Sequence, residues 1–215
     1  MNLYFENLDK SFNGNKVLEN ISGKISSGDK IGLIGINGIG KTTLAKILSG
    51  AESVEKGQVV IPLSLRILYL EQDPRFDQKT TVYDELYKTS LKNTSSQAPS
   101  HLIKKALNTV GLPEKIWKQP ASSLSGGEKT KLLLARLVVS DFDFLLLDES
   151  TNHLDIETCQ RLEDYLSQLN KTMLIISHDR FFLDQIVHKI WELTPEGLKV
   201  FKAITATIKS RRKSK

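Results

Sequence analysis

A glycine-rich segment between two apolar stretches constrains the fold of this chain more than any other feature. Residues 35–42 read Gly-Ile-Asn-Gly-Ile-Gly-Lys-Thr, the spacing G-x-x-x-x-G-K-[ST]. Residues 30–34 before it have the composition of a short buried strand, and residues 43–48 after it are spaced as an amphipathic helix. Strand, glycine loop and helix in this order form the context that a phosphate-binding loop requires. The segment therefore predicts an α/β fold that holds nucleotide phosphates at the end of a strand.

The residues of this loop have the chemistry that phosphate binding needs. Glycine lacks a Cβ, so the loop can adopt positive φ angles and bring backbone N–H groups close to phosphate oxygens. Lys41 supplies a cation, the Thr42 hydroxyl is placed to ligate Mg²⁺, and a helix beginning near Lys41 adds its positive dipole end. A dinucleotide-binding G-x-G-x-x-G motif that begins at Gly38 is excluded, because its last glycine would fall at position 43, which is Thr. The predicted nucleotide-binding residues of the loop are Asn37, Gly38, Gly40, Lys41, Thr42 and Thr43.

The length of the chain and the distribution of its charges limit the possible kinds of protein. The 215 residues suffice for one α/β domain with a sizeable core. The net charge is +5, but residues 209–215 carry five positive charges and no acid, so residues 1–208 are neutral overall. A basic face for nucleic acid is therefore not indicated. The tail fits a solvated, disordered end, an RNA-binding arm or the start of a linker that continues beyond this chain.

Cysteine content and hydropathy indicate a cytoplasmic protein. The single cysteine, Cys159, excludes an internal disulfide framework and is assigned no role. No apolar run approaches the roughly 18 residues that a membrane span needs, and the N-terminus lacks the pattern of a signal peptide. Any membrane role would require a separate partner.

Alternating strand and helix patterns predict a mainly parallel sheet with two additions. Residues 3–8, 16–21 and 24–25 predict a small antiparallel sheet with Asn13-Gly14 as a hairpin turn. Further strands are expected over residues 59–61, 65–70, 142–147 and 172–177, and helices over residues 82–91, 102–110 and 129–139. A helical subdomain is thus expected at about residues 80–140. We predict one domain over residues 1–205 and a basic, disordered tail over residues 206–215.

Two carboxylates follow a strand that is expected to be buried. Residues 144–147 are Phe-Leu-Leu-Leu, and Asp148 and Glu149 come directly after them. A strand followed by an acidic turn is common, and by itself it indicates no chemistry. After a phosphate loop, however, Asp148 is placed to bind Mg²⁺ directly or through water. Glu149 is placed where a base that polarises the attacking water should lie.

A second glycine motif precedes a predicted helix. Ser125 followed three residues later by Glu128 is a capping box for the helix over residues 129–139. Gly126 and Gly127 are not needed for that cap. They leave N–H groups at a helix N-terminus open to close approach by an anion.

The order of these motifs resembles the nucleotide-binding domain of ABC-type ATPases. The motifs are the phosphate loop, Gln72, Leu124-Ser-Gly-Gly-Glu128, Leu145-Leu-Leu-Asp-Glu149 and Ser177-His-Asp179, and the resemblance covers about residues 1–200. It implies an α/β fold with an N-terminal antiparallel subdomain and a helical subdomain, and ATP with Mg²⁺ as the bound species.

The resemblance also implies roles for single residues. Gln72 corresponds to a glutamine that contacts Mg²⁺ or water and links the core to the helical subdomain. His178 corresponds to a switch histidine that contacts the γ-phosphate, and Asp155 to the D-loop aspartate of the family. Phe12 lies where an aromatic residue stacks on adenine, and Tyr4 is a weaker candidate. The implied catalytic residues are Glu149, His178 and Gln72, and the implied Mg²⁺ ligands are Thr42, Gln72 and Asp148.

The family implies that ATP lies between the phosphate loop of one domain and the Ser-Gly-Gly motif of another. This chain has one copy of each, so it contributes two half-sites. Hydrolysis is then expected to need a homodimer or a second ABC domain. In that arrangement Ser125, Gly126 and Gly127 would contact the partner's nucleotide, and Asp155 is predicted to be a further nucleotide-binding residue.

Two branches of the family remain open. The run Thr151-Asn-His-Leu-Asp155, Glu128-Lys129 and residues 178–183 resemble the ABC-F group, which acts mostly on ribosomes in translation or antibiotic resistance. The alternative is the energy-coupling subunit of a membrane transporter. Ser150 departs from the family, because a proline usually follows the glutamate. The interval between Gln72 and Leu124 is too short for the long helical arm of some ABC-F domains, and a single ABC domain is consistent with an isolated or truncated first half.

Overall fold

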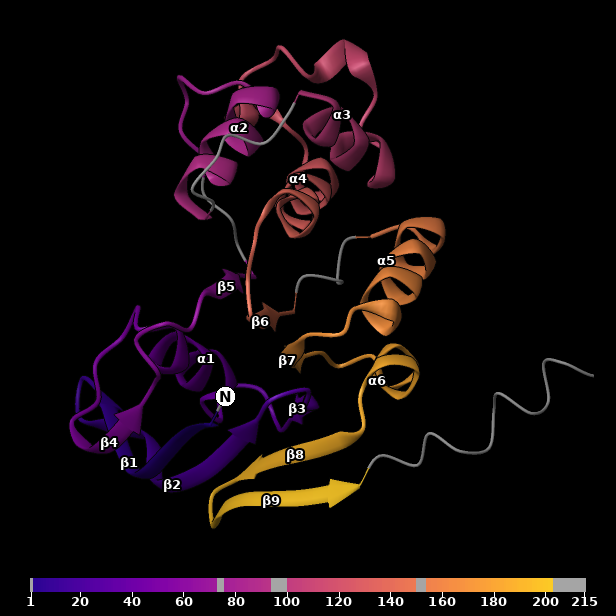
Figure 1. Ribbon diagram of the computed structural model, residues 1–215. Helices are drawn as coiled ribbons and strands as arrows, with labels where there is room; N and C mark the ends of the chain where they lie inside the picture. Colours follow the sequence, from indigo (N-terminus) through magenta and orange to yellow (C-terminus); the bar gives the residue numbers. More distant parts are fainter. Residues whose placement is uncertain (1, 73–75, 94–99, 150–153, 203–215) are drawn as a thin grey trace, which may run out of the picture.

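The computed structural model describes residues 2–72, 76–93, 100–149 and 154–202. It consists of an antiparallel sheet, a larger mostly parallel sheet and a group of helices (Figure 1). The predicted α/β fold is confirmed. In the described parts of the chain, no helix has both the length and the apolar composition needed to cross a membrane.

The N-terminal strands form the predicted antiparallel sheet. Its order is β2-β1-β4, with β1 at Asn2–Phe12, β2 at Asn15–Ser26 and β4 at Lys56–Val60. Asn13 and Gly14 make the predicted hairpin turn, with φ angles of 50° and 80°. These positive values suit Asn-Gly in a tight hairpin. The prediction of two separate segments at residues 16–21 and 24–25 is wrong, because β2 is one strand in which Gly23 lies opposite Phe5.

The larger sheet has the order β5-β6-β7-β3-β8-β9. The first five strands run parallel, and β9 pairs antiparallel with β8. The strands are β3 (Lys30–Ile34), β5 (Ile67–Leu70), β6 (Phe144–Asp148), β7 (Thr172–Ile176), β8 (Lys189–Thr194) and β9 (Gly197–Lys202). All residues of β6 and β7 are buried, as the apolar runs predict. The hairpin of β8 and β9 is not among the predicted elements.

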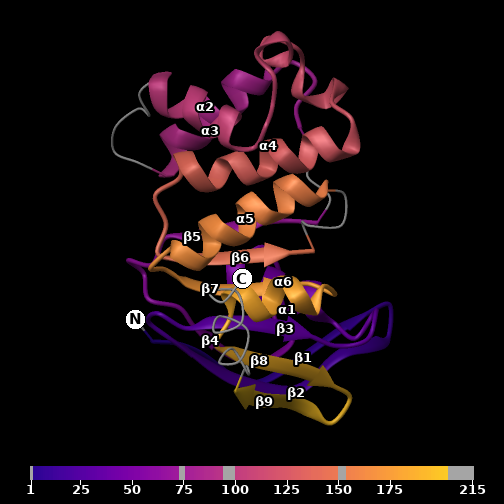
Figure 2. The same ribbon diagram turned by 90° about the vertical axis from the view of Figure 1, so that its right-hand side faces the viewer.

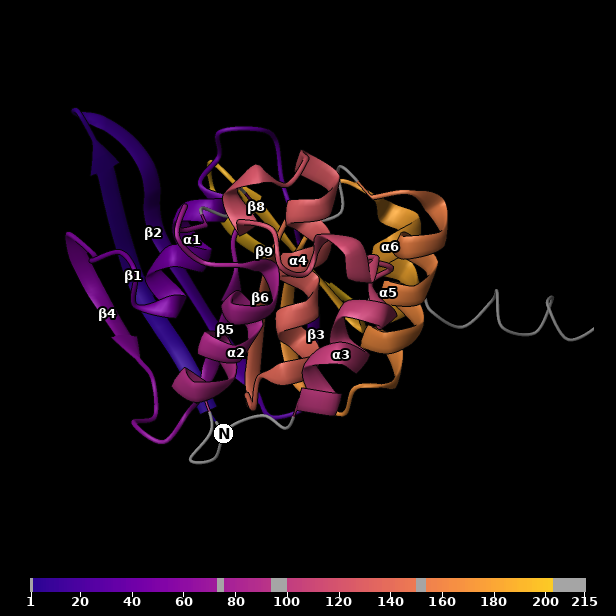
Figure 3. The same cartoon turned by 90° about the horizontal axis from the view of Figure 1, so that it is seen from above.

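Six α-helices flank the sheets in the described parts of the chain (Figure 2). Helices α2, α3 and α4 lie together on one side, and the described residues of this region, 82–93 and 100–139, contain helices and loops but no strand. Figure 3 shows this helical region from above, with the antiparallel sheet to one side of it and α5 and α6 to the other. The helices are α1 (Lys41–Ser49), α2 (Val82–Asn93), α3 (Ser100–Thr109), α4 (Gly126–Val139), α5 (Ile156–Gln168) and α6 (Arg180–Ile186), with 3₁₀ turns at Glu114–Ile116 and Ala121–Ser123. Both the predicted domain end at residue 205 and the tail fall outside the described residues.

The larger sheet separates two hydrophobic cores. One core lies between this larger sheet and the three-stranded antiparallel sheet, and it includes residues of α1. The other packs residues of α4, α5 and α6 against the opposite face and extends into α2 and α3. Phe5 on β1 and Trp191 on β8 join the two sheets, with ring centroids 5.9 Å apart in an edge-to-face contact.

Replacing Phe5 with alanine should destabilise the domain strongly. Phe5 is fully buried, and its ring occupies the space that a side chain at Gly23 would need. Loss of a buried aromatic ring typically costs about 3–5 kcal/mol of unfolding free energy. Urea denaturation of the variant measures this loss. Phe201→Ala is the control, because Phe201 is 49% exposed and should change the unfolding free energy by only about 0.5 kcal/mol.

Candidate active site

The phosphate loop joins β3 to α1 as its motif predicts. Gly40 caps α1 in a left-handed conformation with φ 106°, and Gly38 has φ 79°. A Cβ on Gly40 would lie 2.9 Å from the carbonyl oxygen of Val17 and 2.7 Å from Leu18 Cδ2. Backbone conformation and space both demand glycine here. Because Gly40 has no side chain to cap the helix, the first N–H groups of α1 are open to an anion.

A hollow of about 430 Å³ lies over this loop. All six loop residues predicted to bind nucleotide line it. Gln72 and Glu149, which come from distant parts of the sequence, line it as well, and so does Val17 of β2. Val17 carries no recognisable signal of its own, because its position depends on how the antiparallel sheet packs beside the loop. The full lining is Val17, Asn37, Gly38, Gly40, Lys41, Thr42, Thr43, Gln72 and Glu149.

Three side chains converge on the Glu149 carboxylate. His178 Nε2 lies 2.9 Å from Oε1, and Gln72 Nε2 donates to Oε2 over 3.2 Å. Lys41 Nζ lies 4.0 Å from Oε1, and it donates to the carbonyl oxygens of Gly35 at 3.0 Å and Ile36 at 3.2 Å. The structure thus brings together all three residues predicted to be catalytic, beside the lysine of the phosphate loop.

Glu149 has an unusual backbone conformation. Its φ is 44°, and its N–H donates to the carbonyl oxygen of Ile176 over 2.9 Å, which extends the pairing of β6 with β7 by one residue. A left-handed conformation at a non-glycine residue costs on the order of 1–3 kcal/mol and is frequent at functional sites. The turn aims the carboxylate at the hollow, where it is 14% exposed.

Asp148 ends β6, directly before Glu149, and is fully buried. Burial raises the pKa of its carboxyl, and hydrogen bonds from the Thr42 and Tyr69 hydroxyls oppose that shift. The Tyr69 hydroxyl lies 3.2 Å from Asp148 Oδ2. Thr42, Asp148 and Gln72 each carry a side-chain oxygen, the ligand type that Mg²⁺ prefers. These residues therefore fit the predicted metal, and Tyr69 is a contact that the sequence analysis missed.

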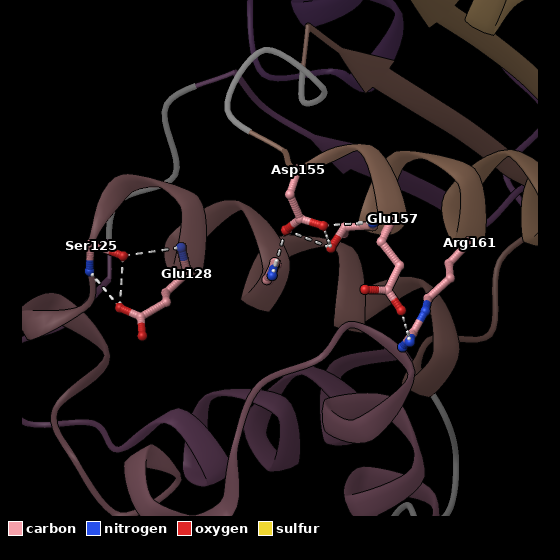
Figure 4. Close-up of polar contacts among 7 residues, drawn as sticks. Ser125, Glu128, Asp155, Glu157 and Arg161 are labelled. Carbon is pink, nitrogen blue, oxygen red and sulfur yellow. Dashed lines mark hydrogen bonds and ion pairs between the residues drawn. The ribbon is translucent and has the colours of Figure 1, made fainter.

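Ser125 and Glu128 form the predicted capping box at the start of α4 (Figure 4). The Ser125 hydroxyl and N–H donate to Glu128 Oε2 over 2.7 Å and 3.0 Å, and the Glu128 N–H donates to Ser125 Oγ over 3.4 Å. These bonds lower the pKa of the Glu128 carboxyl. A Cβ on Gly126 would meet nothing within 4 Å, so the helix end is accessible. Neither Ser125 nor Gly126 nor Gly127 lines the hollow over the phosphate loop of this chain.

Asp155 lies at the start of α5 (Figure 4). It does not line the hollow over the phosphate loop. Its Oδ1 accepts from the Thr158 N–H over 2.9 Å, and its Oδ2 lies 2.8 Å from Lys131 Nζ of α4. The Lys131 ammonium and the Thr158 hydrogen bonds hold the pKa of Asp155 well below its usual range. Within this chain Asp155 is a helix cap, and its role toward a partner stays a prediction. Residues 150–153, which include Ser150 and most of the ABC-F run, lie outside the described residues.

Two aromatic candidates for adenine stacking lie on the antiparallel sheet. Phe12 is 43% exposed at the end of β1, and Lys10 Nζ lies 5.2 Å from its ring centroid. Tyr4 is half-buried within β1, opposite Lys24 and Val60. Neither residue lines the hollow, so the stacking role of both stays a prediction. Cys159 is half-buried on α5, where burial raises the pKa of its thiol.

Comparison with known proteins places these motifs in one family. The family model described as ABC transporter matches residues 18–152. The uncharacterized ABC transporter ATP-binding protein YfmR of Bacillus subtilis is 32% identical over 92% of this chain and 37% of its own length. The ribosome protection protein VmlR of the same organism is 33% identical over 92% of this chain and 35% of its own length. Both are ABC-F proteins. The chain spans about a third of the length of the curated relatives it matches.

Solved structures agree on the fold. The dimeric ATP-binding cassette MJ0796, described as bound to ADP and Pi after hydrolysis, superposes with a TM-score of 0.83 at 19% identity, covering 94% of this chain and 98% of that one. At this identity the likeness supports the fold alone, and it confirms the predicted ABC-type architecture of an antiparallel sheet, a mostly parallel sheet and a helical portion.

Proposed function

This chain belongs to the ABC transporter family of ATPase domains, and from that membership we propose that it binds Mg·ATP over its phosphate loop and hydrolyses it when two such domains close together. One observation carries the proposal. Glu149 lines the hollow over the phosphate loop, and its carboxylate contacts the side chains of Gln72 and His178. Its Oε1 lies 4.0 Å from Lys41 Nζ. A carboxylate beside the phosphate cradle is what a water-polarising base requires.

The residues around the loop would have different roles in binding and hydrolysis. Asn37, Gly38, Gly40 and Thr43 would cradle the phosphates, with Lys41 as the cation and the N-terminus of α1 as the dipole. Thr42, Asp148 and Gln72 would hold Mg²⁺, which when bound neutralises charge on the phosphate oxygens. Glu149 would orient and polarise the attacking water. His178 and Gln72 already contact Glu149, so they are placed to fix its orientation and to contact the γ-phosphate or metal.

The domain offers only half of each site by itself. The Ser125-Gly126-Gly127 start of α4 is accessible yet separate from the hollow, which supports its use against the nucleotide of a partner domain. A second copy of the chain or a tandem ABC domain would supply the complement. Asp155 would lie at the same interface.

A Ser125→Arg substitution should block closure and spare ATP binding by the single domain. The long cation would occupy the space in which the partner's phosphates fit, and misplacement at this scale can reduce turnover by about 100-fold. Phosphate release and ATP-induced dimerisation, measured by light scattering, test this expectation.

Ser125→Asp is the matched variant for this test, because it preserves an N-cap while placing a negative charge against the partner's phosphates. Both variants should lose dimerisation, and only Ser125→Arg should also lose about 1 kcal/mol of stability with the cap. If either variant formed the ATP-induced dimer as the unaltered chain does, Ser125 would not contact the partner's nucleotide.

We further propose that the chain acts as an ABC-F-type ATPase in translation or in protection of ribosomes against antibiotics. Glu128-Lys129 and residues 178–183 support this assignment by sequence, and VmlR, a relative named as a ribosome protection protein, is 33% identical. Sedimentation of a Glu149→Gln variant with ATP distinguishes the branches. Co-sedimentation with ribosomes is expected, whereas a protein that pellets with membranes and never with ribosomes would be the coupling subunit of a transporter.

A further inference from the structure

The Tyr69 side chain reaches Asp148 from the neighbouring strand. β5 and β6 pair in parallel with Tyr69 opposite Leu146. Side chains two residues apart on a strand share a face, so Asp148 lies on the same face as Leu146, one step further along. A tyrosine is long enough to span that step, and its hydroxyl lies 3.2 Å from Asp148 Oδ2. The contact follows from the strand register and not from an adjacent position in the chain.

Packing holds both partners in place. The Tyr69 ring packs against the hydrophobic core that contains α1, and Asp148 has no exposed surface. The Thr42 hydroxyl, from the first turn of α1, also hydrogen-bonds to Asp148. The carboxylate is therefore held by one hydroxyl from the phosphate-loop helix and one from β5.

We propose that Tyr69 is a positioning residue for the metal site, because its hydroxyl fixes the rotation of the Asp148 carboxylate that would hold Mg²⁺. This inference rests on the Mg·ATP site proposed above. The terminal torsion of an aspartate is broad, so a carboxylate that loses one of its two hydroxyl donors can sample a wider range of orientations. Partners that orient a metal ligand commonly contribute 10- to 100-fold to metal affinity. Tyr69 does not line the hollow, so it would act on the metal without touching the nucleotide.

A Tyr69→Phe variant isolates the hydroxyl, because it retains the ring and its packing. Binding of a fluorescent ATP analogue is titrated with Mg²⁺, and binding of the same analogue is measured in EDTA. We expect the variant to need about tenfold more Mg²⁺ for half-maximal enhancement of binding, with binding in EDTA unchanged. Tyr165→Phe is the matched control, since Tyr165 is also half-buried and donates to the Leu137 carbonyl oxygen far from the metal site.

Tyr69→Leu separates the hydroxyl from the ring. It should show the same Mg²⁺ defect as Tyr69→Phe together with a lower melting temperature. If Tyr69→Phe titrates like the unaltered chain and only Tyr69→Leu is defective, the ring and not the hydroxyl matters, and the inference is wrong. If the unaltered chain binds the analogue equally well with and without Mg²⁺, the proposed Mg·ATP site itself fails. The two failures are thus distinguished by which protein shows them.

Discussion

A Glu149→Gln variant should retain nucleotide binding and lose hydrolysis by about 10²- to 10⁴-fold, the range that a positioned general base contributes. Glutamine has almost the same shape as glutamate but cannot accept a proton. The backbone turn with φ 44° should persist. The contacts from His178 and Gln72 use different oxygens of the carboxylate, so the amide oxygen of the variant can accept one of them, and its NH₂ can donate to Gln72 once the Gln72 amide turns its own oxygen inward. The defect would therefore report the missing charge and not a displaced loop.

Single-turnover phosphate release and binding of a fluorescent ATP analogue measure the two effects separately. Glu55→Gln is the matched control. Glu55 is an exposed carboxylate that accepts from the Ser11 N–H in the antiparallel sheet, away from the hollow, so its amide variant should hydrolyse ATP normally. Turnover by Glu149→Gln above a tenth of the unaltered rate would remove Glu149 from the role of base and assign hydrolysis to another group.

Local patterns predicted the parts of the site that lie within one short segment. The phosphate loop, the buried strand ending at Asp148 and the capping box at Ser125 each depend on neighbours a few residues away. Such features follow from side-chain periodicity, glycine conformation and helix capping. The resemblance to a known family was needed to connect them with Gln72 and His178, which carry no local signal of their own.

Contacts between distant segments could not be predicted in the same way. Val17 reaches the hollow from β2, Tyr69 reaches Asp148 from β5, and Lys131 pairs with Asp155 across two helices. Each depends on strand register or helix packing, which a single sequence does not specify. For β2, the sequence predicted an interruption that the structure does not have. Its polar and glycine positions suggested a break, but pairing with β1 on one side holds the strand through Gly23.

Replacing Lys41 with alanine should weaken ATP binding by about 30- to 150-fold. Lys41 is 6% exposed, and its ammonium group already lies against the loop carbonyls and near Glu149, so it needs little reorganisation to meet phosphate oxygens. A hydrogen bond from such a charged donor contributes about 2–3 kcal/mol, which converts to that change in affinity. Equilibrium titration with ATP in the presence of Mg²⁺ measures it.

Lys46→Ala provides the control on the same helix. Lys46 lies exposed in the last turn of α1, so removing it changes net charge equally while leaving the phosphate loop intact. ATP affinity should fall steeply in Lys41→Ala and remain nearly unchanged in Lys46→Ala. An equal loss in both variants would mean that overall charge attracts the nucleotide, and unchanged affinity in Lys41→Ala would contradict the phosphate-loop assignment. A specific loss at Lys41 would locate the triphosphate at the N-terminus of α1, next to Glu149.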